Sequence, residues 1–297
     1  MRPRYVIDAL ARERMRALLR ERLGPRADEL LQYVVPLFNL ERGSKPIVAG
    51  CAAKVSVKGV RFLFTAAHVV DRLLEAPIHV MCDGGRFAQL TGESCFTEPV
   101  PGTTRDDDRI DAGVLRLDEH SAASVTGPYL SIRDLDINED ERAPYCLIAG
   151  YPSSRLKKDF ESRVLVARPL RYAATRIGVD ATLPSGIVDH SHVVLSFERE
   201  AVLDEDGRRM TAPAPDGMSG CGVWAWRSLV RPGSKGRDRL IAIFTDHWET
   251  HDIMVSTRVT VHAHLLKAKW PDVGRDIPEP RRIQVRSRAV TPDGPAA

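Results

Sequence analysis

The chain has 297 residues, of which 43% are hydrophobic and 28% are charged, as is usual for a soluble globular protein. Its 43 basic and 40 acidic residues leave a net charge of +3, which is too small to favour nucleic acid as the main partner. No apolar run is long enough to span a bilayer, so a membrane protein is not expected. The length suits one large all-β domain or two small domains.

The sequence predicts an N-terminal helical extension over residues 1–45. Residues 5–23 carry an apolar stripe at helical spacing, and Gly24 and Pro25 end it. Residues 27–38 predict a second, shorter helix. The stripe could pack on its own domain or bind a protein partner, and the sequence leaves both readings open.

From residue 46 onward the pattern changes to short β-branched runs separated by turn-rich stretches, which predicts antiparallel barrels or sandwiches. The runs cover residues 54–60, 61–65, 78–82, 112–117, 146–151, 163–167, 192–197, 222–226, 239–245 and 252–259. Residues 259–270 predict a closing helix, so we expect one domain over residues 46–270. The proline-rich residues 271–297 predict a flexible tail.

The five cysteines are scattered and include no C-x-x-C pair, which favours free thiols and a cytoplasmic protein. Charged residues interrupt any secretory signal core near the N-terminus, which favours the same compartment. The pairs His190/His192 and His262/His264 could each share a strand face. They lack cysteine or carboxylate partners at ligand spacing, so we expect no metal site and no cofactor.

Ser219 lies between two glycines in DGMSGCGVW, residues 216–224. A G-x-S-G string alone is weak, because acyl transfer by serine also needs a base, a carboxylate and oxyanion donors. His68 follows the apolar run FLFTAA and is the candidate base. Asp111 opens another apolar run, where a buried carboxylate needs a partner such as His68.

Three motifs carry a family resemblance: TAAH at 65–68, DAGVL at 111–115 and GMSG at 217–220. In this order and spacing they resemble the signatures of the chymotrypsin-fold, or trypsin-like, serine peptidases, and the bacterial branch without disulfides is the most similar. The resemblance covers residues 46–268. It implies an all-β fold of two antiparallel six-stranded barrels. It also implies a serine endopeptidase that forms a covalent acyl-enzyme, with His68 as base, Asp111 as its orienting carboxylate and Ser219 as nucleophile.

The same resemblance implies further site residues. The N–H groups of Gly217 and Ser219 would form the oxyanion hole. Thr245, Asp246 and His247 would lie along the cleft, where an extended peptide substrate pairs with a strand edge. The Thr245 hydroxyl is also expected to bond the carboxylate of Asp111.

Two departures from the family pattern bear on specificity and activation. Pro213, followed by Ala214, stands where cleavage after arginine or lysine requires an acid, so the sequence favours a small or apolar side chain before the scissile bond. Met218 replaces the aspartate of zymogen-type members, which argues against activation by a newly cleaved N-terminus. Two alternatives remain open, a catalytically silent peptide-binding module on the same fold and a serine esterase.

Overall fold

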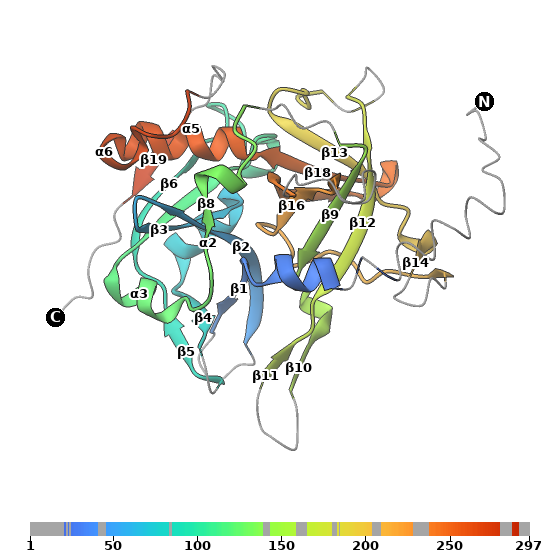
Figure 1. Ribbon diagram of the computed structural model, residues 1–297, viewed down its shortest axis with the longest axis horizontal. Coiled ribbons are helices and arrows are strands. Elements are labelled where there is room, and N and C mark those ends of the chain that lie inside the picture. Colours follow the sequence, from blue (N-terminus) through green and yellow to red (C-terminus); the bar gives the residue numbers. More distant parts are fainter. Residues whose placement is uncertain are drawn as a thin grey trace.

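Two β units lie side by side in the fold, with helix α5 (Val259–Lys269) against both (Figure 1). The computed structural model describes residues 21, 23, 25–40, 46–82, 85–138, 143–158, 165–179, 183, 185–203, 209–227, 238–279 and 287–290. The stripe expected as a helix over residues 5–23 lies almost wholly outside the described residues. No helix within them has the length and apolar character to cross a membrane.

The N-terminal unit is one curled sheet, which has nine strands in the described part of the chain. Its order is β19-β6-β7-β3-β2-β1-β4-β5, and β8 pairs with β2 in parallel. The strands are β1 (Val34–Asn39), β2 (Ile47–Val57), β3 (Val60–Thr65), β4 (Ile78–Met81), β5 (Phe87–Gln89), β6 (Gly92–Thr97), β7 (Gly113–Leu117), β8 (Leu130–Ser131) and β19 (Ser287–Val290).

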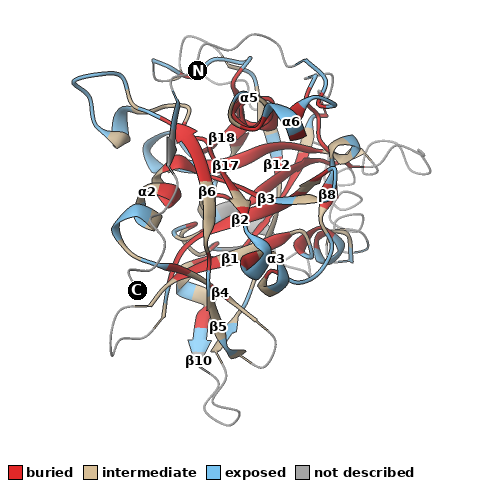
Figure 2. Cartoon of the chain, turned by 90° about the vertical axis from the view of Figure 1, so that its left-hand side faces the viewer, coloured by how far each residue is buried: buried red, intermediate tan, exposed pale blue. Residues whose placement is uncertain are grey.

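Both faces of this sheet are buried, because its central strands carry apolar residues on either side. Phe62 and Phe64 of β3 belong to the core that the two β units share, and Leu63 between them packs inside the curl. Figure 2 shows β2 and β3 buried in the middle of the molecule. The sheet is therefore a wall between two packed cores, and its strand ends reach the junction of the units.

The C-terminal unit is a closed barrel with the strand order β12-β13-β18-β17-β16-β9. Closure gives every strand a neighbour on both edges over at least part of its length, and side chains such as Leu147, Val223 and Trp224 are fully buried. The strands are β9 (Tyr145–Gly150), β12 (Leu170–Ile177), β13 (His192–Ser196), β16 (Gly222–Ala225), β17 (Leu240–Trp248) and β18 (Ile253–Arg258).

Smaller elements surround the two units. The hairpin β10–β11 projects from the barrel at the bottom of Figure 1. The hairpins are β10 (Leu156–Lys158) with β11 (Leu165–Ala167), and β14 (Val202–Leu203) with β15 (Arg209–Met210). The described helices also include α2 (Ala67–Glu75), α3 (Glu119–Ser124), α6 (Pro271–Gly274), η2 (Arg105–Asp107), η3 (Ile132–Asp134), η4 (Ser153–Arg155), η5 (Arg199–Ala201) and η6 (Glu249–His251).

The expectation of helix over residues 27–38 is wrong beyond residue 31. Residues 25–31 are helical, but β1 follows and pairs with β2 on one edge and β4 on the other. The run from Val34 to Phe38 is rich in β-branched and aromatic residues, which suit a strand with two partners. Pro36 is accommodated next to a register shift between Leu37 and Phe38. The first β unit therefore begins at residue 34 and not at 46.

The tail expected from residue 271 contains ordered elements. Helix α6 follows α5 directly, and Val273 and Ile277 are buried in the shared core. Strand β19 pairs with the outer edge of β6. Because β7 occupies the other edge of β6, no edge of β6 is left for β5, and the expected second closed barrel is instead an open, curled sheet.

Candidate active site

His68 lies in the first turn of α2, directly after β3. The two alanines before it are fully buried, and their small side chains let the chain turn from strand into helix against the core. The Thr65 hydroxyl donates to the carbonyl oxygen of Cys51 on β2 at 2.7 Å, which fixes the end of β3. The imidazole is about one quarter exposed, with 27% of the side chain accessible. It therefore faces the junction of the two β units.

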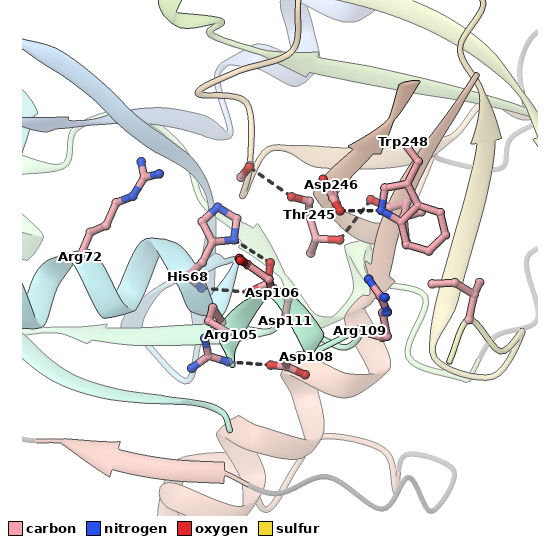
Figure 3. A pocket seen from close by; sticks show the side chains of 13 residues that line it. His68, Arg72, Arg105, Asp106, Asp108, Arg109, Asp111, Thr245, Asp246 and Trp248 are labelled. Carbon is pink, nitrogen blue, oxygen red and sulfur yellow. Dashed lines mark hydrogen bonds and ion pairs between the residues drawn. The ribbon is translucent and has the colours of Figure 1, made fainter. Parts of the chain in front are cut away.

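Asp111 precedes β7 and bonds His68 twice, as Figure 3 shows. Its Oδ1 accepts the backbone N–H of His68 at 2.8 Å, and its Oδ2 lies 2.7 Å from His68 Nδ1. Burial raises the pKa of the Asp111 carboxyl, and the hydrogen bonds from His68 oppose this shift in part. An ionised carboxylate accepts only, so it selects the tautomer with a proton on Nδ1 and leaves Nε2 of His68 free to accept a proton.

The loop that carries Ser219 is anchored on both sides. Cys51 N–H donates to the Ser219 carbonyl oxygen, and Gly220 N–H donates to that of Phe244, each at 2.7 Å. Gly220 has φ +96°, and a Cβ there would lie 1.8 Å from the Cys51 carbonyl oxygen, so only glycine fits. The loop is thus fixed against β2 of the first unit and β17 of the second.

His68, Asp111 and Ser219 line one cavity of about 430 Å³, which we call the His68 cavity. The fold therefore brings the three side chains predicted from the sequence to the same cavity. The Ser219 hydroxyl, however, donates to the Thr245 carbonyl oxygen at 3.2 Å. No described hydrogen bond links it to His68. The serine side chain is thus held on the barrel side of the cavity.

Two backbone donors of the serine loop carry no hydrogen bond within the described residues. The N–H groups of Met218, Gly220 and Cys221 are bonded to carbonyl oxygens, whereas those of Gly217 and Ser219 are not. Gly217 has φ +83°, a conformation that glycine adopts without strain. The loop therefore presents two uncommitted donors at the positions expected for an oxyanion hole.

The predicted segment from Thr245 to His247 forms the end of β17 and borders the cavities at Ser219. Pairing with β16 stops at Ile243, while pairing with β18 continues to the end of β17. The last residues of β17 therefore have a strand on one edge and no described strand on the other. The expected bond from Thr245 to Asp111 is wrong, because the Thr245 hydroxyl donates to the Val255 carbonyl oxygen at 3.1 Å.

A second cavity of about 560 Å³ adjoins Ser219, and we call it the Asp216 cavity. The residues proposed from sequence to set specificity, Pro213 and Ala214, are half-buried and line neither cavity. A turn closed by Met218 N–H to the Pro215 carbonyl oxygen, at 2.9 Å, brings Pro215 and Asp216 beside the serine instead. The lining of the Asp216 cavity comprises Arg109, Pro215, Asp216, Ser219, Phe244, Thr245, Asp246, His247, Trp248, Glu249, Thr250 and His251.

Charged and aromatic residues border the two cavities, and of these Arg109, Trp248 and Glu249 were not among the site residues predicted from the sequence. The Arg109 guanidinium lies over the Trp248 ring, 5.3 Å from its centroid, and the two side chains lie next to each other on one side of the His68 cavity in Figure 3. The Asp246 carboxylate accepts from His247 N–H at 2.7 Å and from Trp248 Nε1–H at 2.6 Å. With Asp216 and Glu249, three carboxylates line the Asp216 cavity. Nothing in the sequence spacing marks Arg109 as a neighbour of Trp248.

The histidine pairs weighed as metal ligands have other surroundings. His192 and His262 are fully buried, and each hydrogen-bonds backbone carbonyl oxygens. His262 and His264 lie on helix α5 and not on a strand. Across the described residues, no group of three or more metal-ligating side chains is arranged around a common point. The five cysteines are all free thiols in the structure.

No protein-family model and no curated protein matches the sequence. Among solved structures, human heparin binding protein is similar, with a TM-score of 0.50 and 14% identity over 85% of this chain and 95% of that one. A structure named GrC has a TM-score of 0.47 and 15% identity over 81% of this chain and 94% of that one. Identities this low establish a fold and not an activity. The chain has the fold of the chymotrypsin-like serine proteases, with one closed six-stranded barrel and a curled sheet beside it.

Proposed function

We propose that this protein is a serine endopeptidase with Ser219 as nucleophile, His68 as general base and acid, and Asp111 as the carboxylate that orients His68. One observation carries the proposal: the paired His68 and Asp111 share a cavity with a serine whose loop presents two uncommitted N–H donors. The proposal also places the protein in the disulfide-free branch of the fold and in the cytoplasm. The five free cysteines support both assignments.

The chemistry follows from these groups. The Ser219 hydroxyl turns from the Thr245 carbonyl oxygen toward His68 Nε2 and attacks the scissile carbonyl carbon as its proton passes to Nε2. Asp111 stabilises the imidazolium, and the N–H groups of Gly217 and Ser219 bind the oxyanion. The tetrahedral intermediate expels the amine, which takes the proton from His68. Water, deprotonated by His68, then hydrolyses the acyl-enzyme and restores Ser219.

The substrate in this proposal is an extended peptide. Beside Ser219, the end of β17 has no strand of the described residues on one edge, and a peptide strand could add there through main-chain hydrogen bonds. The carboxylates of Asp216, Asp246 and Glu249 in the adjoining cavity favour a basic substrate side chain. This differs from the small or apolar preference suggested by Pro213.

A second candidate is a catalytically silent peptide-binding module, and one observation favours it. The Ser219 hydroxyl is bonded to the Thr245 carbonyl oxygen and not to His68. A serine that stayed in this position would lack its base. The two candidates share the fold and the cleft, and they differ in whether the hydroxyl of Ser219 is reactive.

A fluorophosphonate probe tests the proposal, because it reacts with an activated serine. We expect labelling at Ser219 and none in Ser219→Ala, and both Ser219→Ala and His68→Ala should lower peptide turnover by roughly 10⁴-fold to 10⁶-fold. A peptide library with Lys, Arg, Ala or Val before the scissile bond then measures the side-chain preference. A folded protein that the probe does not label would support the binding module, and labelling with ester but no peptide hydrolysis would support an esterase.

A further inference from the structure

The backbone at Asp111 is strained and needs support. Its φ is +44°, in the left-handed region that a residue with a Cβ seldom adopts, which costs about 1 kcal/mol. Such a conformation persists only where the surroundings over-determine it. The residues that fix this backbone therefore also fix the carboxylate that bonds His68.

His192 of the C-terminal barrel holds the backbone two residues before Asp111. Its fully buried ring places Nε2 2.7 Å from the Arg109 carbonyl oxygen. Nδ1 lies 2.9 Å from the Ser191 hydroxyl and 3.2 Å from both the N–H and the carbonyl oxygen of Val188. Burial lowers the pKa of His192, so the ring is neutral. The Arg109 carbonyl oxygen can only accept, and it lies closer to the ring than the Val188 carbonyl oxygen does, so the neutral ring donates from Nε2 to Arg109.

Thr257 holds the next carbonyl group. It lies opposite His192 in the pairing of β13 with β18, and its buried hydroxyl donates to the Ile110 carbonyl oxygen. Side chains opposite each other in an antiparallel pair lie on the same face of the sheet. One cross-strand pair of the barrel thus binds two consecutive carbonyl groups of the other β unit, at residues 109 and 110.

The N-terminal unit supports the same backbone from the other side. Ala67 N–H donates to the Asp111 carbonyl oxygen at 3.1 Å, and Ala112 N–H donates to the Thr97 hydroxyl oxygen at 3.0 Å. Asp111 is therefore held between the units: its own unit fixes the carbonyl group of residue 111 and the N–H that follows. The barrel fixes the two carbonyl groups that precede residue 111.

We propose that His192 and Thr257 are positioning residues, which clamp the backbone of residues 109–110 to the barrel and thereby hold the Asp111 carboxylate against His68. This inference rests on the proposed peptidase function. It assigns the barrel a second task besides carrying Ser219: it fixes the geometry of the base on the other β unit. Loosening the clamp would let Asp111 relax from its strained backbone and turn its carboxylate away from His68.

Matched threonine variants test the clamp. Thr257→Val removes the hydroxyl that holds residue 110, and Thr257→Ser keeps it. Thr260→Val is the control, because the Thr260 hydroxyl is also fully buried and donates to a backbone carbonyl oxygen, that of Ile137, at 2.9 Å. His192→Leu and His192→Gln form a second pair, in which the glutamine amide can still donate to residue 109. Each variant is measured for kcat, KM, thermal stability and the downfield NMR resonance of the His68 Nδ1 proton.

We expect Thr257→Val and His192→Leu to lower kcat by roughly 10-fold to 100-fold, with a smaller change in KM, because a misplacement of about 1 Å near reacting groups costs up to about 100-fold. Thr257→Ser and His192→Gln should recover most of the rate. Thr260→Val should lose comparable stability yet keep kcat. The Nδ1 proton resonance should broaden or vanish in Thr257→Val and persist in Thr260→Val.

The NMR resonance separates failure of the clamp from failure of the proposed function. If the wild-type protein cleaves no peptide, loss of the His68 Nδ1 resonance in Thr257→Val alone still supports the clamp. If Thr257→Val matches Thr260→Val in kcat and in this resonance while both lose stability, the contact is only structural and the inference is overturned. The threonine variants decide the matter even where His192→Leu does not fold.

Discussion

The carboxylate of Asp111 bonds both the backbone N–H and the ring Nδ1 of His68, at 2.8 and 2.7 Å, so the two residues are fixed in orientation as well as in distance. The backbone N–H can only donate, so the oxygen that meets it must accept. The second oxygen then determines which ring nitrogen carries the proton. The relationship therefore makes the tautomer of His68 sensitive to a change of one atom in Asp111.

Asp111→Asn changes that atom. The backbone N–H of His68 keeps the amide oxygen as its partner, so the amide NH₂ group faces Nδ1 and makes it an acceptor. The proton then sits on Nε2, and His68 cannot take the serine proton. We expect kcat to fall by roughly 10⁴-fold with little loss of folding stability, measured by peptide hydrolysis and thermal unfolding.

The matched control for Asp111→Asn is Asp106→Asn, an exposed carboxylate of the same cavity. It should change kcat by less than about threefold, because surface charges are screened by solvent. Equal effects of the two substitutions would mean that the charge of the cavity, and not the tautomer of His68, controls the rate.

Gly220→Ala should disrupt the serine loop. The added methyl group would lie 1.8 Å from the Cys51 carbonyl oxygen and 2.4 Å from Thr65 Oγ1, at φ +96°. The loop must move away from β2, with loss of the bond between Cys51 N–H and the Ser219 carbonyl oxygen. We expect the free energy of unfolding to fall by roughly 3 kcal/mol and fluorophosphonate labelling to disappear, measured by urea denaturation and mass spectrometry.

Gly59→Ala is the control that separates the cost of backbone strain from the cost of steric overlap in Gly220→Ala. Gly59 has φ +81°, but a Cβ there meets no atom within 4 Å. Its replacement should cost about 1 kcal/mol and leave labelling intact. A similar stability loss in both variants, with labelling preserved in Gly220→Ala, would contradict the assignment of a close-packed serine loop.

Local sequence pattern selected His68, Asp111 and Ser219 as candidates, and the order and spacing of the three motifs added the family resemblance. His68 and Asp111 stand where apolar runs begin or end, and Ser219 stands in a glycine turn before another run, so each side chain is placed at a strand end. Strand ends reach the junction of the β units, where a cleft can form. The lining of the cavities required the fold itself, because Arg109 and Trp248 become neighbours only when the two β units dock.

Strand pairing also explains the errors in the fold. β1 reads as a helix continuation until β2 and β4 are placed beside it, and a four-residue strand such as β19 has no pattern of its own. His192 and Thr257 look like ordinary strand residues in the sequence. Their hydrogen bonds to residues 109 and 110 depend on how the two units dock, which no local periodicity encodes.

His262 should make the protein less stable in acid. The ring is fully buried, Nε2 lies 3.0 Å from the Thr65 carbonyl oxygen, and burial lowers its pKa to about 4. The unfolded chain, with an ordinary histidine pKa of about 6.5, binds more protons between these values. Stability contributed by neutral His262 is therefore fully present above about pH 6.5 and is lost as the pH falls toward 4.

His262→Gln removes this titration and keeps an amide donor near Thr65. Between pH 6.5 and 4 the free energy of unfolding should fall less in the variant than in the wild-type protein. The difference between the two falls should be about 3 kcal/mol. Urea denaturation at several pH values measures the slopes. His120→Gln, at an exposed position, should retain the wild-type slope; a wild-type slope in His262→Gln would show that other groups govern acid unfolding.

The thiols beside the serine should be unreactive in the folded protein. Cys51 and Cys221 are fully buried, and burial raises the pKa of Cys51 to about 12 and that of Cys221 well above its ordinary value. Because the thiolate is the nucleophile, iodoacetamide at pH 8 should leave both unmodified and leave activity intact. Half-buried Cys82 should react first, so Cys82→Ser is the background in which to measure alkylation by peptide mapping. Rapid modification of Cys221 in the folded protein would contradict the protection of this thiol by burial.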